Sequence, residues 1–161
     1  MNMFIQEFIT PEEQGILANW GNDIRDNGIL KTVWPKIAQY HQVRNVPKAF
    51  WDVRSRIASV LNLENIEEER FTSFISVCEA GEYLTPHVDR LSPRQKGRHR
   101  KAIVLVQAAE NGGVPFIEDV EIHVPERAMW SFWADSQLHG FTMILGAKRR
   151  IICSYGFWVR D

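Results

Sequence analysis

The hydrophobic periodicity of this 161-residue chain changes once, near residue 70, and this change limits the folds available to it. Before that point apolar residues recur at helical spacing. After it, short runs of β-branched and aromatic residues are separated by turn residues. Helices followed by many short strands predict an α+β fold. No repeat or linker interrupts the pattern, so we expect one domain over 1–161, with a helical part at about 1–65 and a β core at about 70–161.

Two helices are expected in the first part. A capping-box pattern at Thr10–Glu13, with Pro11 at the first helical position, begins one helix, and Asn27-Gly28 ends it. A second helix is expected from Pro47 to Leu61. The apolar residues at helical spacing in these segments are Ile16, Leu17, Trp20 and Ile24, then Phe50, Val53, Ile57 and Leu61.

The β part is expected to form a double-stranded β-helix, or jelly roll, with the helices packed on one of its two sheets. The turn signals Asn111-Gly112-Gly113 and Leu145-Gly146-Ala147 separate some of its strands. The expected strands are Phe71–Val77, Lys101–Gln107, Val114–Phe116, Val120–Val124, Ala128–Trp133, Gln137–Ile144 and Arg149–Val159.

Composition and charge exclude several classes of function. The chain is 45% hydrophobic and 24% charged, and its net charge of -1 gives no reason to expect binding to nucleic acid or membrane. The first residues have no basic n-region and no long apolar stretch, so no signal peptide is expected, and no apolar run approaches the length of a membrane span. The two cysteines, Cys78 and Cys153, lie far apart and are expected to be buried free thiols. We therefore expect a cytoplasmic protein.

The segment around His87-Val88-Asp89 carries the chemistry that the sequence predicts. In an extended segment, residues two apart point to the same face, so an imidazole and a carboxylate can meet one cation. Two histidines and one carboxylate hold iron(II) in oxygenases that leave the other metal positions open. Of the five histidines, His139, in an expected strand, is the best third ligand. A lone His-x-Asp pair is more often a histidine near a surface turn beside a solvated aspartate.

Arg149 follows His139 by ten residues, after the turn at Gly146, and opens the last strand. A buried arginine must find an anion, and its fork suits the far carboxylate of a dicarboxylate bound to the metal. The expected inward-facing set of this strand is Arg149, Ile151, Cys153 and Tyr155. The cluster Lys148-Arg149-Arg150 leaves the register ambiguous by one residue, and Arg149 is favoured over Arg150. The alternative is that Arg149 is a solvated residue of the turn.

The region from Ser76 to Trp158, about half of the chain, resembles the prolyl-4-hydroxylase-like branch of the iron(II)- and 2-oxoglutarate-dependent oxygenases. The resemblance implies a jelly-roll core, His87, Asp89 and His139 as iron ligands, and Arg149 as the 2-oxoglutarate anchor. The order and spacing of the matching motifs are more specific than any single motif. In chain order, the motifs are Gly81 ahead of His87-Val88-Asp89, then Gly112-Gly113-Val114-Pro115-Phe116, Val124-Pro125, Phe132 before His139, and Arg149 ahead of Tyr155-Gly156-Phe157-Trp158.

The chain departs from the family pattern around the co-substrate. Cys78 stands where the family often has a tyrosine, and Gln107 is offered by the strand that often carries a second tyrosine. Gln107 can still donate a hydrogen bond, and Tyr83 supplies a hydroxyl near the expected site. These departures affect the second co-substrate contact rather than the metal ligands.

The sequence thus predicts a dioxygenase that uses Fe(II), 2-oxoglutarate and O2 and hydroxylates a C–H bond, releasing succinate and CO2. Its substrate is expected to be a small molecule, an amino acid or a short peptide. Asp89 favours hydroxylation, because related halogenases replace this carboxylate with a small residue. Two alternatives stay open: a zinc-dependent hydrolase with the same triad, and a non-catalytic jelly-roll module that binds metal or ligand.

The remaining signals are weaker. The basic stretch Arg90–Lys101 is interpreted as a solvated hairpin loop, with a loop that attracts anions to the site mouth as the alternative. His41, His99 and His123 are not expected to be ligands. Of the six tryptophans, one from the β part can line the substrate pocket. Its candidates are Trp130, Trp133 and Trp158.

Overall fold

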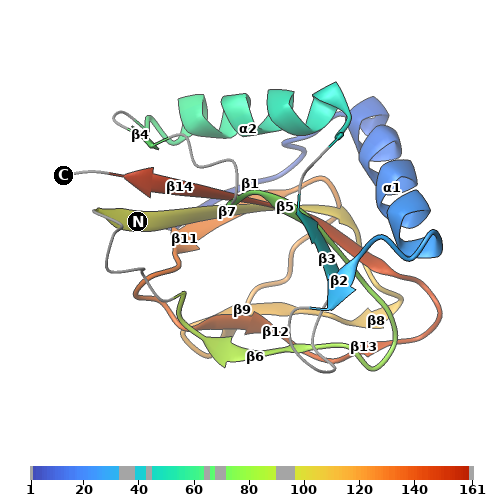
Figure 1. The fold of residues 1–161 in the computed structure, drawn as a ribbon. Helices are drawn as coiled ribbons and strands as arrows, with labels where there is room; N and C mark the ends of the chain where they lie inside the picture. Colours follow the sequence, from blue (N-terminus) through green and yellow to red (C-terminus); the bar gives the residue numbers. More distant parts are fainter. Residues whose placement is uncertain are drawn as a thin grey trace.

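The computed structural model describes residues 2–32, 39–42, 45–63, 66–67, 72–89 and 97–159, with only the backbone described at 31–32, 39–42 and 66–67. Two helices cover one face of a large antiparallel sheet, and a smaller antiparallel sheet lies on its other side (Figure 1). The helices are α1 (Pro11–Asp26) and α2 (Lys48–Val60). The expected layout of helices on one sheet is therefore present.

The large sheet has eight strands within the described part of the chain. Its order is β1-β11-β7-β14-β5-β3-β2, and β4 pairs with β14. Its strands are β1 (Met3–Ile5), β2 (Lys31–Thr32), β3 (Gln39–Gln42), β4 (Ile66–Glu67), β5 (Phe74–Cys78), β7 (Arg98–Gln107), β11 (Met129–Trp133) and β14 (Arg150–Val159). Short strands β1, β2 and β3 were not predicted, because they lie in the part of the chain expected to be helical.

The smaller sheet has four strands in the order β10-β9-β12-β6, and a two-strand pair joins β13 to β8. These strands are β6 (Leu84–His87), β8 (Asn111–Gly112), β9 (Pro115–Ile117), β10 (Val120–Glu121), β12 (His139–Phe141) and β13 (Ile144–Leu145). The expected strand Gln137–Ile144 is thus divided into β12 and the start of β13. The small sheet faces the large one across the interior (Figure 1).

The local signals at the helix ends are confirmed. The Thr10 hydroxyl accepts from the Glu13 N–H, and the Glu13 carboxylate accepts from the Thr10 N–H, so the capping box is complete. Asn27 caps the other end of α1, and α2 runs between Pro47 and Leu61 as predicted. One detail was wrong: Ile16 is 40% exposed. The buried face of α1 consists of Leu17, Gly21 and Ile24.

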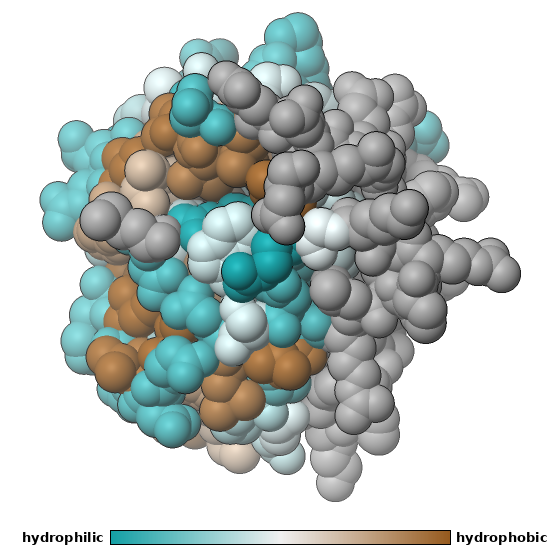
Figure 2. Space-filling model, turned by 90° about the vertical axis from the view of Figure 1, so that its left-hand side faces the viewer, coloured by the Kyte–Doolittle hydropathy of each residue, from teal (hydrophilic) through white to brown (hydrophobic). Residues whose placement is uncertain are grey.

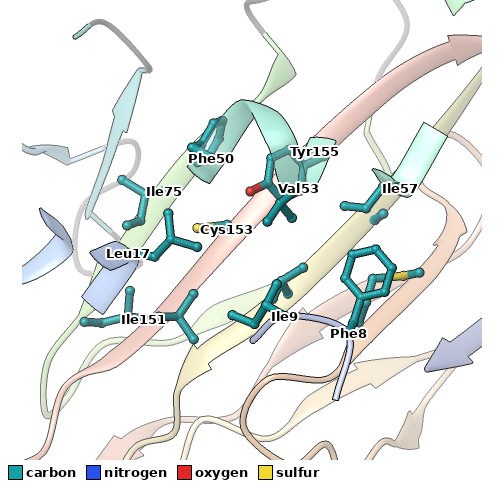
Figure 3. Close-up of a cluster of buried hydrophobic side chains, with 14 of the residues drawn as sticks. Phe8, Ile9, Leu17, Phe50, Val53, Ile57, Ile75, Ile151, Cys153 and Tyr155 are labelled. Atoms are coloured by element: carbon teal, nitrogen blue, oxygen red, sulfur yellow. The ribbon is translucent and has the colours of Figure 1, made fainter. Parts of the chain in front are cut away.

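The main core lies between the helices and the large sheet. Phe50, in the first turn of α2, is fully buried and contacts the ring of Tyr155 at a centroid distance of 4.6 Å. Burying an aromatic side chain of this size contributes about 1.5–3 kcal/mol to folding. Figure 3 shows β14 contributing Ile151, Cys153 and Tyr155 to this cluster. The odd-numbered residues of β14 therefore face the helices, and its even-numbered residues face the small sheet.

Both cysteines are buried free thiols, as expected. On the face shown in Figure 2, apolar residues lie above and below a band of hydrophilic residues. No helix in the described part of the chain is long and apolar enough to cross a membrane.

Candidate metal centre

The two predicted histidine ligands lie opposite each other on neighbouring strands of the small sheet. His87 ends β6, His139 begins β12, and the two residues are partners in the antiparallel register. Their ring centroids are 4.3 Å apart. The next residue, Gly140, lets the strands approach closely, because a Cβ there would lie only 2.4 Å from the carbonyl oxygen of Leu84. The fold thus brings together two histidines that are distant in sequence.

Asp89 follows β6 and is held by its backbone. Its N–H donates to the carbonyl of Ala134 at 2.7 Å, and the Ala134 N–H donates to the carbonyl of His99 at 2.9 Å. This places Asp89 Oδ1 at 3.4 Å from Nε2 of His87 and 3.5 Å from Nε2 of His139. One ligand atom from each of the three residues lies within 4.8 Å of the others. The structure therefore groups the three residues that the sequence analysis selected.

The hydrogen bonds of the imidazoles fix which nitrogen is available to a cation. Nδ1 of His87 lies 2.9 Å from the carbonyl of Thr85, and Nδ1 of His139 lies 2.9 Å from the carbonyl of Gln137. A carbonyl only accepts hydrogen bonds, so each Nδ1 carries the hydrogen and each Nε2 presents a lone pair. Nε2 of His139 is buried and has no hydrogen-bond partner among the described residues. Burial lowers the pKa of His139, which favours the neutral ligand form.

These donors fit a first-row divalent metal. At metal–ligand distances of about 2.1 Å, neighbouring donors are separated by about 3.0–3.4 Å for ligand angles from octahedral to tetrahedral. The two Oδ1–Nε2 distances, 3.4 and 3.5 Å, lie close to this range. A centre with two neutral imidazoles and one carboxylate suits iron(II) and also zinc. The protein would leave the remaining coordination positions of either metal open.

A lysine and a third histidine surround the other side of the Asp89 carboxylate. Lys101 Nζ lies 2.5 Å from Oδ2, and Nδ1 of His99 lies 3.3 Å from it. Burial by itself raises the pKa of Asp89, but contacts with the imidazoles and with the Lys101 ammonium outweigh this effect. The pKa of Asp89 consequently lies well below its usual range, so the carboxylate is ionised and able to bind a cation.

The three residues open into a cavity of about 850 Å³ between the two sheets. This volume is typical of small-molecule sites. Most of the lining side chains are apolar, and Asp89 is the one acidic residue among the described residues that line it. Among the apolar lining residues are Leu84, Phe116, Trp130, Phe132, Leu138 and Phe141. Trp130 is thus the tryptophan of the β part that lines the cavity, as Trp133 and Trp158 do not.

The arginine that faces the cavity is Arg150, and the predicted inward set of the last strand was wrong by one residue. Arg150 lines the cavity with Ile152 and Ser154, whereas the predicted Ile151, Cys153 and Tyr155 belong to the core under the helices. Because β14 is buried on both faces, its hydrophobic pattern does not distinguish one face from the other.

Arg149 lies on the outside of this cavity and is paired with acidic residues. Its Nη2 lies 2.7 Å from Asp26, and its Nε lies 2.9 Å from Glu79. It also donates to Asn22 at 3.2 Å. These contacts connect the end of α1 to the loop after β5. Hydrogen bonding to Asp26 is the main cause that raises the pKa of Arg149. Arg149, the predicted co-substrate anchor, therefore joins α1 to the loop after β5 and does not line the cavity.

The side chain of Arg150 has the properties expected of an anion-binding group. It is 3% exposed, and its guanidinium lies over the Phe141 ring at 4.5 Å from the centroid. Its Nη1 has no hydrogen-bond partner among the described residues. Burial lowers the pKa of Arg150 to about 10, so it remains charged at neutral pH. An unpaired buried charge is costly, and a bound carboxylate would remove this cost.

The two other predicted co-substrate residues lie away from the cavity. Gln107 donates from Nε2 to the backbone carbonyl of Arg149 at 2.8 Å, so it supports the start of β14. Neither Gln107 nor Tyr83 is among the described residues that line the cavity. Both residues thus lie outside the described lining of the cavity that holds His87, Asp89 and His139.

Lys101 and His99 are the residues that the sequence analysis did not place in the site. Both lie on β7 and are buried, at 8% and 5% exposure. The basic stretch that contains them is thus not solvated at its end, while 90–96 lie outside the described residues. A lysine two positions after a histidine, at the start of the apolar run Ala102–Gln107, was the available signal. His123 is exposed, as expected, and the side chain of His41 is not described.

The fold is similar to those of solved prolyl hydroxylases. A Pseudomonas putida prolyl-4-hydroxylase has a TM-score of 0.73 and 16% identity, over 99% of this chain and 92% of that chain. A viral collagen prolyl hydroxylase from Paramecium Bursaria Chlorella virus-1, in its 2-oxoglutarate complex, has a TM-score of 0.76 and 15% identity, over 99% and 96%. A Trichoplax adhaerens prolyl hydroxylase, bound to a hypoxia inducible factor peptide fragment, has a TM-score of 0.77 and 12% identity, over 98% and 83%. No family model and no curated protein matches the sequence. At these identities the likeness establishes the fold.

Proposed function

We propose that this chain is a single-domain iron(II)- and 2-oxoglutarate-dependent dioxygenase of the prolyl-4-hydroxylase-like branch, built on a jelly-roll core. The observation that carries the proposal is the convergence of Nε2 of His87, Oδ1 of Asp89 and Nε2 of His139 at the wall of an apolar cavity. The similarity of the fold to prolyl hydroxylases supports the same conclusion.

In this proposal Arg150, rather than Arg149, anchors 2-oxoglutarate. The Arg150 guanidinium lies over Phe141, which is two residues along β12 from His139. Two residues of a strand span about 7 Å, which suits a five-carbon dicarboxylate held by the metal at one end and by arginine at the other. Ser154, on the same face of β14, has a buried hydroxyl without a hydrogen-bond partner among the described residues. It is a candidate for a further polar contact.

The chemistry would be shared between the bound groups and the protein. Dioxygen would be the oxidant and bound iron would mediate its reduction, with one oxygen atom going to succinate as 2-oxoglutarate loses CO2 and the other going to the substrate C–H bond. The three ligands would fix the position of the metal, and Arg150 would orient the co-substrate. Apolar residues such as Phe132 and Trp130 would exclude water from the reaction and hold the substrate C–H bond near the metal.

The substrate is proposed to be a small molecule, an amino acid or a peptidyl residue. The cavity volume of about 850 Å³ accommodates a co-substrate and part of a second molecule. A solved neighbour is bound to a peptide fragment, which is compatible with a peptidyl substrate here. A zinc hydrolase would need a general base, and no acid other than Asp89 lines the cavity among the described residues.

An anaerobic titration with iron(II) and 2-oxoglutarate tests the proposal. The wild-type protein should develop the visible charge-transfer band of the iron chelate, and zinc(II) should not produce it. Asp89→Ala should abolish the band, and in a separate aerobic assay it should abolish succinate formation, while circular dichroism shows a folded protein. A folded wild-type protein without a band would contradict the oxygenase proposal and favour the ligand-binding module. Full activity of the Asp89 variant would remove Asp89 from the ligand set.

A further inference from the structure

The two oxygens of the Asp89 carboxylate face different partners. Oδ1 faces Nε2 of His87 at 3.4 Å and Nε2 of His139 at 3.5 Å. Oδ2 faces Lys101 Nζ at 2.5 Å and Nδ1 of His99 at 3.3 Å. One oxygen is therefore directed towards the metal-binding imidazoles, and the other is directed away from them towards the large sheet.

Lys101 comes from the opposite wall of the cavity. It lies on β7, whereas the metal-binding residues belong to the small sheet and to the segment that follows β6. Its side chain is 11% exposed, so the ammonium needs a partner, and Asp89 is the acid that contacts it. The ammonium and Oδ2 form a close ion pair, at a separation of 2.5 Å. This contact therefore restricts the rotation of the Asp89 carboxylate.

His99 faces the same oxygen of Asp89 from a packed position. Its ring stacks on Trp158, with centroids 4.5 Å apart and an interplanar angle of 17°. Gly156, on the same strand as Trp158, lies beside the ring, because a Cβ there would be 2.7 Å from Nε2 of His99. The His99 ring is thus packed against this strand, and its Nδ1 lies near Oδ2 of Asp89. Lys101 and His99 thus both lie next to Oδ2 of Asp89 on the side of the large sheet.

Lys101 is too far along the sheet to share the anion proposed for Arg150. In the β7–β14 ladder Lys101 pairs with Gly156, which is six residues from Arg150. Six residues of a strand span about 20 Å. The two cations therefore approach the cavity at different points, and the role of Lys101 is to be sought in the contact that it makes with Asp89.

We propose that Lys101, with His99 beside the same oxygen, is a positioning residue that holds Oδ2 of Asp89 so that only Oδ1 binds the metal. Carboxylates bind metals through one oxygen or through both. Occupying Oδ2 prevents the second mode and keeps a further coordination position open. The inference rests on the proposed metal site. It adds a residue that belongs neither to the ligand set nor to the predicted co-substrate contacts.

Two neutral variants of Lys101 separate hydrogen bonding from charge. Lys101→Gln keeps a donor for Oδ2 but removes the charge, and Lys101→Met removes both while keeping a similar length. If Lys101 positions Asp89 by hydrogen bonding, the glutamine variant should behave like wild type and the methionine variant should not. If Lys101 acts only through its positive charge, both variants should change alike.

Infrared difference spectra of the apo-protein with and without manganese(II) provide the readout. The separation of the antisymmetric and symmetric carboxylate stretches is wide for ligation through one oxygen and narrow for ligation through both. Wild type and Lys101→Gln should show the wide separation, and Lys101→Met should show the narrow one. A wide separation in metal-bound Lys101→Met, or a change shared by both variants, would overturn the inference while leaving the metal site intact.

A wild-type protein that gives no carboxylate difference signal with manganese(II) would overturn the metal site, and with it the role of Lys101. Circular dichroism establishes that each variant is folded before its spectrum is interpreted. If Lys101→Met is unfolded, Lys101→Leu takes its place, because it also removes the donor and the buried charge. Lys101→Arg should keep the wide separation of the two carboxylate stretches, since arginine supplies both a donor and a charge.

Discussion

Exchanging the two neighbouring arginines for methionine should produce opposite effects on stability and on ligand binding. Arg150 is buried without a partner for Nη1 among the described residues, whereas Arg149 makes two ion pairs near the surface. Arg150→Met should leave the apo-protein equally stable or more stable and should remove 2-oxoglutarate binding. Arg149→Met should lower stability and leave 2-oxoglutarate binding unchanged.

The magnitudes follow from the environment of each guanidinium. Burial lowers the pKa of Arg150 from 12.5 to about 10, which corresponds to about 3 kcal/mol against the charged form. Methionine avoids this cost but loses some packing against Phe141. The ion pairs of Arg149 involve partners that are 42% and 62% exposed, so solvent screening limits their contribution to about 1 kcal/mol.

The effect on binding is set by the buried carboxylate–guanidinium pair that the proposal predicts. Truncating one partner of such a pair costs about 2–5 kcal/mol, which raises the dissociation constant of 2-oxoglutarate at least about thirtyfold. Urea unfolding followed by tryptophan fluorescence measures stability, and calorimetric titration of the manganese(II)-loaded protein measures binding. Loss of binding in the Arg149 variant with normal binding in the Arg150 variant would refute the assignment of the anchor from the register of β14.

Three further predictions concern the fold. Gly140→Ala should destabilise the protein by more than about 2 kcal/mol in urea unfolding, because its Cβ would clash with the backbone of β6, whereas Gly15→Ala, in open space on α1, should stabilise it by up to about 1 kcal/mol. Burial raises the pKa of Glu13, but the pair with Arg56 outweighs this and holds it below 4.5, so its stabilising contribution is complete above that pH and is lost as the pH falls through the lowered value. Glu13→Gln should therefore flatten the dependence of unfolding free energy on pH below 4.5. Burial raises the pKa of Cys153 to about 12, so a thiol reagent should modify it only after unfolding, as mass spectrometry can establish.

The helices were predictable because their signals are local. The capping box at Thr10 and Glu13 involves hydrogen bonds between residues three apart, so its sequence pattern and its structure describe the same contacts. The buried stripe of α2 likewise follows from helical spacing. Ile16 was misassigned because Gly21 extends the buried face of α1 where a hydrophobicity pattern has no signal.

The grouping of the three proposed metal ligands was predictable for a related reason. The pair His87 and Asp89 is local, and only one distant residue had to be found among few histidines. The structure brings His139 opposite His87 through strand pairing, which sequence spacing alone does not determine. Lys101 was not found, because its contact with Asp89 crosses from one sheet to the other and depends on how the two sheets face each other.

The choice between Arg149 and Arg150 as the proposed co-substrate anchor depends on the register of β14, which the sequence does not determine. In a strand whose two faces are both buried, either set of alternate residues could face the cavity. A shift of one residue in the register moves every side chain to the opposite face. In β14 one face meets the helices and the other meets the cavity, and both carry apolar residues. The distinguishing feature is polar: Arg150 and Ser154 share the cavity face, whereas Cys153 and Tyr155 lie under the helices. A buried strand that carries an arginine and a serine four residues apart on one face is therefore better oriented by its polar residues than by its apolar ones.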